Sequence, residues 1–118
     1  QFLSNHPKVS NVNYLGLENH EDHILAKDQM TGFTGMLSFE LKDELDAGMN
    51  FMRGIKFCTL TASLGTADTL VTHSASTSHV NVPKEQRLQY GITDGLIRVS
   101  VGLENIEDII SDFEQALS

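Results

Sequence analysis

The C-terminal part of the chain constrains the fold most, because a strand pattern is followed directly by a helix pattern. Residues 96–101 alternate along the chain, so that Ile97, Val99 and Val101 share one side and Arg98 lies on the other. Asn105 is a suitable N-cap, with acidic residues in the first turn after it. An apolar stripe of helical period then follows, formed by Ile106, Ile109, Ile110, Phe113, Ala116 and Leu117. The pattern predicts a sheet covered by an amphipathic helix.

The rest of the chain continues in the same way. Further strands are predicted over 8–14, 36–41, 55–61 and 69–72, and further helices over 19–30, 42–53 and 83–91. We expect Gly54 to end the second helix, and we expect the first two helices to bury Ile24, Leu25, Met30, Leu45, Met49 and Met52. The strands alternate in polarity, which favours a sheet with helices on one face. The prediction is one α+β domain with a mixed, mainly antiparallel sheet.

Size and charge narrow the class of protein. The 118 residues suit one domain, and 8 basic against 16 acidic side chains give a net charge of −8. This balance argues against nucleic acid and against an anionic membrane as partners. Cys58 is the only cysteine, which fits a reducing compartment such as the cytoplasm. No signal-peptide pattern opens the chain, and the missing initiator Met before Gln1 hints at excision from a longer protein.

Two histidine clusters admit a chemical and a structural interpretation. His20 and His23, with Glu18 nearby, have a spacing that could hold a metal ion, but a solvated first helical turn is favoured, and no metal is expected. His73 and His79 flank a serine-rich segment that could supply a nucleophile. A polar loop is favoured there, because no Gly-x-Ser-x-Gly elbow is present.

Cys58 and Arg98 are the other reactive side chains that stand out. Cys58 lies in an apolar run and is expected to be a buried, inert thiol. Arg98 lies in the middle of a strand, so it must be paired or must face a cleft. Its planar fork suits a carboxylate. From the residue alone, a structural salt bridge with an acidic side chain is favoured over a ligand site.

Several ordered motifs resemble one enzyme family. They are SLGTADTLVTHSASTSH at 63–79, PKEQR at 83–87 and GITDGLIRVSVGLE at 91–104, preceded by HPKV at 6–9, YLGLE at 14–18 and GMLSFEL at 35–41. Together they resemble the C-terminal domain of the pyridoxal-phosphate (PLP) enzymes of Cys/Met metabolism. This family includes cystathionine gamma-synthase, cystathionine gamma-lyase, methionine gamma-lyase and O-acetylhomoserine sulfhydrylase. The resemblance implies the small C-terminal domain of the fold-type I, aminotransferase-like PLP enzymes.

The resemblance implies roles for three residues. Arg98 matches the arginine that grips the α-carboxylate of a sulfur-containing or homoserine-derived amino acid. Ser63, in the Ser-Leu-Gly motif, matches a serine that lines the same pocket, and Ser78 stands near the pocket wall where the family usually has Thr. The resemblance does not separate lyase, synthase and sulfhydrylase, although it leans toward a methionine gamma-lyase or homoserine-ester sulfhydrylase. It also implies a homotetrameric parent.

The departures from the family pattern are equally informative. None of the lysines, Lys8, Lys27, Lys42, Lys56 and Lys84, matches the family's cofactor lysine in its Ser/Thr-x-Lys setting. The family's pyridine-pairing Asp, ring-stacking Tyr and Tyr-x-Arg phosphate motif have no match either. His-Ser-Ala-Ser at 73–76 replaces the usual His-Pro-Ala-Ser, which we expect to loosen that turn.

We therefore expect residues 1–118 to be the substrate-side domain of a longer enzyme whose large cofactor domain lies outside the chain. Alone it should bind no PLP and hold no catalytic residue. The alternative is an autonomous amino-acid-binding or regulatory domain without catalysis. In either case, we expect an exposed apolar patch on the sheet face away from the helices, where the large domain would dock.

Overall fold

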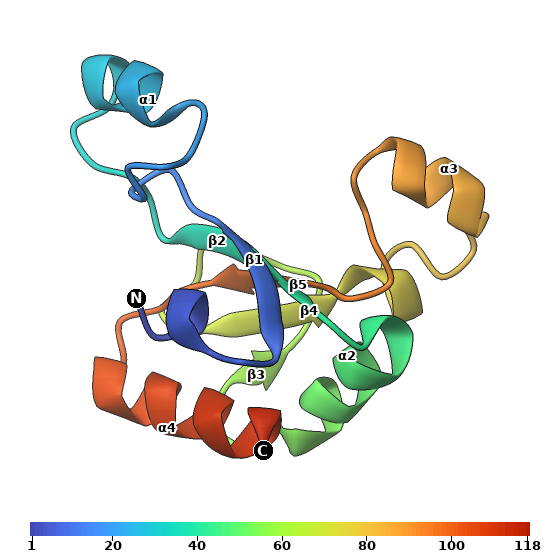
Figure 1. Ribbon diagram of the computed structural model, residues 1–118. Coiled ribbons are helices and arrows are strands. Elements are labelled where there is room, and N and C mark those ends of the chain that lie inside the picture. The colour runs from blue at the N-terminus through green and yellow to red at the C-terminus, as the bar shows by residue number, and fades with distance from the viewer.

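The computed structural model describes all residues, 1–118, and its strands form one five-stranded sheet. The strands are β1 (Val9–Asn13), β2 (Met36–Leu41), β3 (Thr59–Leu60), β4 (Leu70–His73) and β5 (Leu96–Ser100). Their spatial order is β1-β2-β5-β4-β3 (Figure 1). Neighbours pair antiparallel except for β3 and β4, which pair parallel. The predicted mixed, mainly antiparallel sheet is confirmed.

The helices fall into two groups. They are α1 (His23–Gln29), α2 (Glu44–Gly54), α3 (Lys84–Gln89) and α4 (Ile106–Leu117), with short 3-10 helices η1 (Leu3–Asn5) and η2 (Ser74–Ser76). In Figure 1, α2 and α4 lie together below the sheet, while α1 and α3 project above it as two separate arms. The predicted order of strands and α-helices is confirmed, but only α2 and α4 form the layer that covers the sheet.

Three phenylalanine rings join this helical layer to the sheet. Phe51 of α2 meets Phe39 of β2 edge to face, with ring centroids 5.5 Å apart, and meets Phe113 of α4 at 5.4 Å. Val71, Ile97 and Val99 surround them, and the whole group is shielded from water. Edge-to-face aromatic pairs add packing energy beyond the apolar area that they bury. This cluster is the core of the domain.

The first helix is shorter and more exposed than predicted. It begins at His23 instead of near Asn19, and its N-cap residue makes no side-chain cap bond. Ile24 and Leu25 are 76% and 52% exposed, so the prediction that they are buried was wrong. Only Ala26 is buried on this helix. The reason is its position, because α1 stands on an arm and no other helix or sheet layer of this chain covers its apolar side.

The second helix turns a different side toward the core. Phe51 and Gly48 are its buried residues, whereas Leu45 is exposed and Met49 is only partly buried. Gly54 is the last helical residue, not a residue that follows the helix. A Cβ at Gly54 would lie 2.8 Å from Ala116 Cα, so glycine is required for close contact between α2 and α4. The helix buries the side that packs against α4 and β4, not the side marked by the spacing of Leu45, Met49 and Met52.

The strand predicted over 55–61 is reduced to Thr59–Leu60, because a buried carboxylate takes the preceding backbone N–H groups. Asp112 of α4 accepts hydrogen bonds from the backbone nitrogens of Lys56, Phe57 and Cys58, at 2.8, 3.1 and 2.9 Å. These donors are therefore unavailable for strand pairing. Asp112 is itself only 4% exposed, in the middle of the predicted apolar stripe. The predicted Asn105 cap is confirmed, since Asn105 Oδ1 accepts from Glu107 N, and Ile109, Phe113 and Leu117 of the stripe are buried, whereas Ile106 is 55% exposed.

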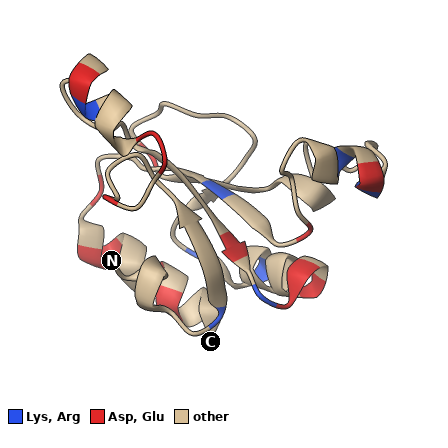
Figure 2. Cartoon of the chain, turned by 45° about the horizontal axis from the view of Figure 1, so that its top comes forward, with Lys and Arg blue, Asp and Glu red and all other residues tan.

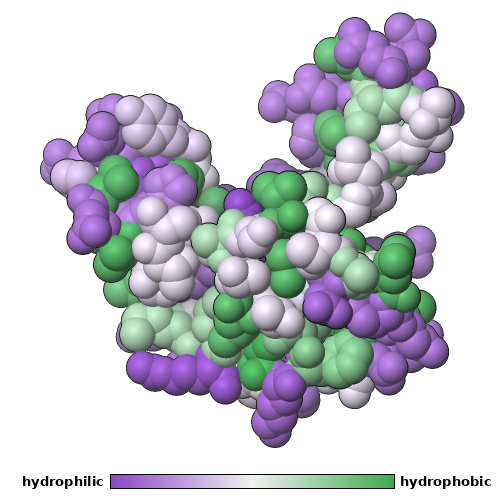
Figure 3. Space-filling model, turned by 180° about the vertical axis from the view of Figure 1, so that it is seen from behind, coloured by the Kyte–Doolittle hydropathy of each residue, from purple (hydrophilic) through white to green (hydrophobic).

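The sheet face opposite α2 and α4 is mainly polar, so the expected apolar patch does not lie there. This face carries Asn11, Asn13, Ser38, Glu40, Arg98 and Thr72. Exposed apolar side chains instead lie on the α1 and α3 arms and beside β3, and Figure 3 shows hydrophobic residues at the surface of both arms. Alternation along the strands places polar residues on the open face because water reaches it.

Charges are scarce on the sheet. Figure 2 shows acidic residues spread over the helices and connections, while the strands carry only Glu40 and Arg98 among Asp, Glu, Lys and Arg. The longest helix has 12 residues, and none has the length and apolar content that a bilayer crossing requires.

Candidate functional site

Arg98 lies at the centre of β5, the middle strand of the sheet. Its Cα partners are Ser38 on β2 and Thr72 on β4. Arg98 Nη2 donates to the carbonyl oxygens of Ala62 and Ser63, at 2.6 and 2.9 Å. The prediction of a salt bridge between Arg98 and an acidic side chain was wrong, since the ion pairs of the structure all involve Lys84 or Arg87. Arg98 is partly open to water, so two carbonyls suffice to hold one side of the fork.

The loop that carries Ser63 is tied to the end of β5. Gly65 N donates to Ser100 Oγ at 2.9 Å, and Gly65 has a φ of 76°, which favours glycine. Glu104 accepts from Thr69 N and Thr69 Oγ1, at 2.5 and 2.8 Å. Burial acts to raise the pKa of Glu104, but these bonds outweigh it and lower the pKa. The loop therefore presents the Ser63 carbonyl to Arg98 from a fixed position.

Ser78 does not join this pair. It lies in the exposed segment after η2, where its Oγ contacts His79 Nδ1 at 2.9 Å. No hydrogen bond links Ser78 to Arg98 or Ser63. The structure thus brings together two of the three residues singled out from the sequence.

The N-terminal histidine pair has structural partners. His20 Nδ1 accepts from Asp22 N at 3.1 Å, and His23 Nδ1 contacts the Leu15 carbonyl at 2.7 Å. The His23 ring also stacks on Phe33, with centroids 5.0 Å apart. No group of three or more His, Cys, Asp or Glu side chains is arranged to hold a metal ion. Both histidines thus have structural contacts, but they do not form the expected solvated first turn, because the helix begins at His23 and the His23 ring is partly buried.

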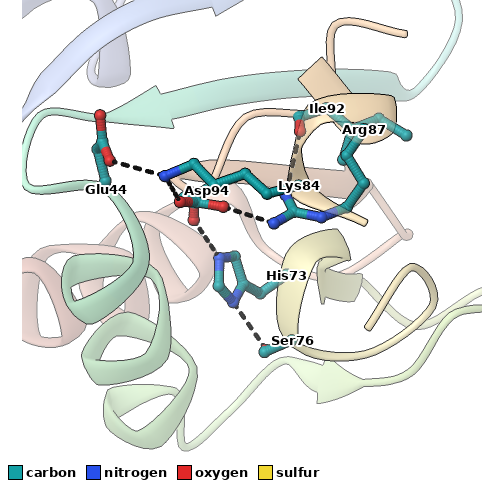
Figure 4. Close-up of polar contacts among 7 residues, drawn as sticks. All are labelled: Glu44, His73, Ser76, Lys84, Arg87, Ile92 and Asp94. Carbon is teal, nitrogen blue, oxygen red and sulfur yellow. Dashed lines mark hydrogen bonds and ion pairs between the residues drawn. The ribbon is translucent and has the colours of Figure 1, made fainter. Parts of the chain in front are cut away.

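An ionic cluster around the buried Asp94 carboxylate holds the second arm in place (Figure 4). Asp94 pairs with Lys84 at 2.5 Å and with Arg87 at 2.7 Å, and Arg87 also donates to the Ile92 carbonyl at 3.2 Å. Hydrogen bonds from Lys84 and then Arg87 hold the pKa of Asp94 below its usual value, although burial opposes them. The cluster connects α3 to the turn before β5.

His73 belongs to the same cluster and is fully buried. Its Nε2 lies 2.6 Å from the Asp94 carbonyl, so Nε2 carries the hydrogen, and its Nδ1 lies 2.8 Å from Ser76 Oγ. No substrate can reach this imidazole, so His73 does not activate a serine nucleophile. The η2 turn forms without the family's proline, because Thr77 Oγ1 also donates to the His73 carbonyl at 2.7 Å.

Cys58 is buried, as predicted. Burial, aided by the nearby Asp112 carboxylate, raises the pKa of the thiol to about 12. The reactive thiolate is therefore scarce at neutral pH, as expected of an inert structural cysteine.

Comparison with known proteins shows the family of the chain. The family model described as Cys/Met metabolism PLP-dependent enzyme matches residues 1–118. The chain belongs to this family. It is 52% identical over 117 residues to an L-methionine gamma-lyase of Fusobacterium nucleatum subsp. polymorphum, covering 99% of the chain and 30% of that relative.

Other relatives carry other names. A cystathionine beta-lyase of Lactococcus lactis subsp. cremoris is 49% identical over 117 residues, covering 99% of the chain and 30% of that relative. A cystathionine gamma-lyase of Bacillus subtilis (strain 168) is 47% identical over 118 residues, covering 98% of the chain and again 30% of the relative. The chain thus spans about 30% of the length of these relatives.

The residues of this chain do not form a complete PLP site on their own. A PLP enzyme of this kind needs a lysine for the Schiff base and an acidic partner for the pyridinium nitrogen. The hollow beside Arg98 contains neither, since it is lined by Asn13, Met36, Leu37, Ser38 and Arg98. Lys84 is committed to Asp94 and Glu44, and Lys8 Nζ donates to the Ser118 carbonyl. What the chain offers is one arginine, Arg98, at the hollow on the open sheet face.

Sequence reasoning missed two features of this family member. The motif 91–104 contains Asp94, but nothing in the spacing shows that Lys84 and Arg87 converge on it.

An apolar cavity of about 390 Å³ also lies on the helical side of the sheet, bordered by Phe2, Tyr14, Leu37, Val99 and Phe113 among others. Its lining lacks any charged side chain, so it is not a carboxylate site.

Proposed function

We propose that this chain is the C-terminal, substrate-side domain of a PLP-dependent enzyme of sulfur amino-acid metabolism. The enzyme acts by gamma-elimination or gamma-replacement on a sulfur-containing or homoserine-derived amino acid. The observation that supports this most is the Arg98 fork on the open sheet face. One nitrogen is held by the Ala62 and Ser63 carbonyls, while no protein group accepts from Nε or Nη1.

An arginine arranged in this way is suited to hold the substrate α-carboxylate. The fork can donate two parallel charge-assisted hydrogen bonds, which fix both the position and the plane of the carboxylate. Such a clamp orients the Cα–H bond of the amino acid for cleavage. Ser63 lines the same subsite, and Ser78 stands at its wall in the assembled enzyme. PLP, bound mainly by the rest of the enzyme, supplies the electron sink.

The rest of the enzyme is proposed to be a large cofactor domain of fold-type I, in a homotetramer. The two arms support this assembly, because they expose apolar side chains that no part of this chain covers. These are Ile24, Leu25, Val80, Leu88 and Tyr90. Exposed apolar surface of this kind usually marks a contact with another domain or subunit. The unpaired Cys58 thiol is compatible with a cytoplasmic enzyme.

A substrate lacking the carboxylate tests the role of Arg98. In the full-length enzyme, kcat/KM should be measured for L-methionine, L-cystathionine and a homoserine ester, and then for the α-amide of the best of them. We expect the amide to be at least about 100-fold worse, because a site built for a charged acceptor leaves its donors unpaired on the amide. Equal kcat/KM values for acid and amide would contradict the proposal.

The 118-residue chain alone should be inactive. After incubation with PLP and reduction with borohydride, we expect the mass of the intact chain to remain unchanged, because its lysines do not line the Arg98 site. A stoichiometric adduct on one lysine would contradict this. Calorimetry of the chain with L-methionine is the companion measurement, and saturable heat would favour the alternative of an autonomous amino-acid-binding domain.

A further inference from the structure

A directed chain of hydrogen bonds crosses the open sheet face and ends beside Arg98. Asn11 Nδ2 donates to Asn13 Oδ1 at 3.1 Å, and Asn13 Nδ2 donates to Ser38 Oγ at 3.3 Å. The Ser38 oxygen is thus an acceptor in the structure. No protein group accepts its hydroxyl hydrogen, so Ser38 ends this chain as a donor without an acceptor.

The register of the sheet places this spare donor at the strand position directly opposite Arg98. Ser38 on β2 is the direct antiparallel partner of Arg98 on β5, and Asn13 is the partner of Ser38. Directly opposed residues of an antiparallel pair lie on the same face, with Cβ atoms about 5 Å apart. Ser38 and Arg98 also line one shallow hollow together with Asn13. The two residues are therefore neighbours at one surface depression.

At the hollow that Ser38 and Arg98 share, the side-chain groups of these two residues that lack a protein partner are donors. Arg98 keeps Nε and Nη1 without protein acceptors, and Ser38 keeps its O–H. Glu40, the one acid on these strands, lies two residues along β2 and forms no ion pair with Arg98. Adjacent unpaired donors beside a fixed cation match an acceptor-only anion such as a carboxylate.

We propose that Ser38 is a second substrate-binding residue, whose hydroxyl donates to the α-carboxylate held by Arg98, and that Asn13 positions that hydroxyl by donating to its oxygen. This inference rests on the proposed function and deepens it. The carboxylate would lie between β2 and the 62–63 loop, held from the Arg98 side and the Ser38 side. Ser38 binds the carboxylate equally in the ground state and the transition state, so it contributes to KM more than to kcat.

Steady-state kinetics of the full-length enzyme test this inference with four variants. Ser38→Ala is expected to raise KM for the best amino-acid substrate about tenfold with kcat nearly unchanged, since one hydrogen bond to a charged group is lost. Ser38→Thr keeps the hydroxyl and should restore most of the affinity. Ser111→Ala removes an exposed serine hydroxyl on α4 and serves as the matched control. Arg98→Lys reports on the proposed function itself.

The outcomes distinguish failure of the role of Ser38 from failure of the proposed function. An unchanged KM in Ser38→Ala, beside a raised KM in Arg98→Lys, overturns the role of Ser38 and leaves the proposed function standing. Unchanged kinetics in both variants overturn both. An equal KM increase for the acid and for its α-amide in Ser38→Ala also overturns the inference, because the effect would not depend on the carboxylate. Circular dichroism of each purified variant verifies that it is folded.

Discussion

Replacing Asp112 with alanine is expected to lower the free energy of unfolding of the 118-residue chain by about 4 kcal/mol. The side chain is almost fully buried and accepts from three consecutive backbone nitrogens, those of Lys56, Phe57 and Cys58. Alanine leaves these three N–H groups without their partner, and the Cys58 N–H lies in a buried position. The segment between α2 and β3 would then lose its attachment to α4.

Urea unfolding at pH 7 measures this effect, with Glu114→Ala as the control. Glu114 is exposed on the same helix, and its loss should change the free energy of unfolding by no more than about 0.5 kcal/mol. A loss below about 1 kcal/mol for Asp112→Ala would contradict the assigned role.

The pH dependence of stability also tests the role of Asp112. Burial acts to raise the pKa of Asp112, but the three backbone hydrogen bonds outweigh it and lower the pKa below the ordinary value. A carboxyl group with a lower pKa when folded contributes stability above its unfolded pKa, and this contribution is lost as the pH falls through the folded value. We expect the native chain to lose stability below about pH 4. Asp112→Ala should lose less over the same range.

Arg98→Lys in the full-length enzyme is expected to reduce kcat/KM about 100-fold to 1,000-fold. Lysine keeps the positive charge but not the planar fork, so it cannot donate two parallel bonds to a carboxylate while also donating to the 62–63 carbonyls. Most of the loss should appear as a higher KM, with a smaller loss in kcat where the substrate is misaligned.

Two comparisons make this result specific. Arg53→Lys, at an exposed position on α2, should leave the kinetics unchanged. The α-amide substrate should lose less than the acid in Arg98→Lys, because its interaction with the fork is already weak. If the variant discriminates between acid and amide as strongly as the native enzyme, Arg98 does not hold the carboxylate.

Local features of the sequence predicted the order of strands and helices. The alternation at 96–101 and the stripe from Ile109 to Leu117 each depend on residues a few positions apart, and the Asn105 cap needs only Glu107. Such periods follow from backbone geometry, in which side chains repeat every two residues in a strand and every 3.6 in a helix. Arg98 was singled out on the same local grounds, as a cation within an apolar strand.

The contacts between distant segments could not be predicted in this way. Asp112 reached residues 56–58, Lys84 and Arg87 met Asp94, and α1 remained uncovered although its spacing suggested a buried side. In each case the contact or the exposure depends on which elements become neighbours. Local propensity does not encode which elements those are.

The sequence by itself determined the element order, the α+β class, the family and the two residues, Arg98 and Ser63, that meet at the candidate site. Only the tertiary structure decided what surrounds them. The pairing of β2 with β5 sets Ser38 opposite Arg98, and the 62–63 loop folds back to hold the guanidinium through carbonyl oxygens. The physical reason is that periodicity acts over neighbouring residues. The register and the hydrogen bonds that surround Arg98 join it to Ser38 and Ser63, which are far away in the sequence, and the packing of the whole chain selects these contacts.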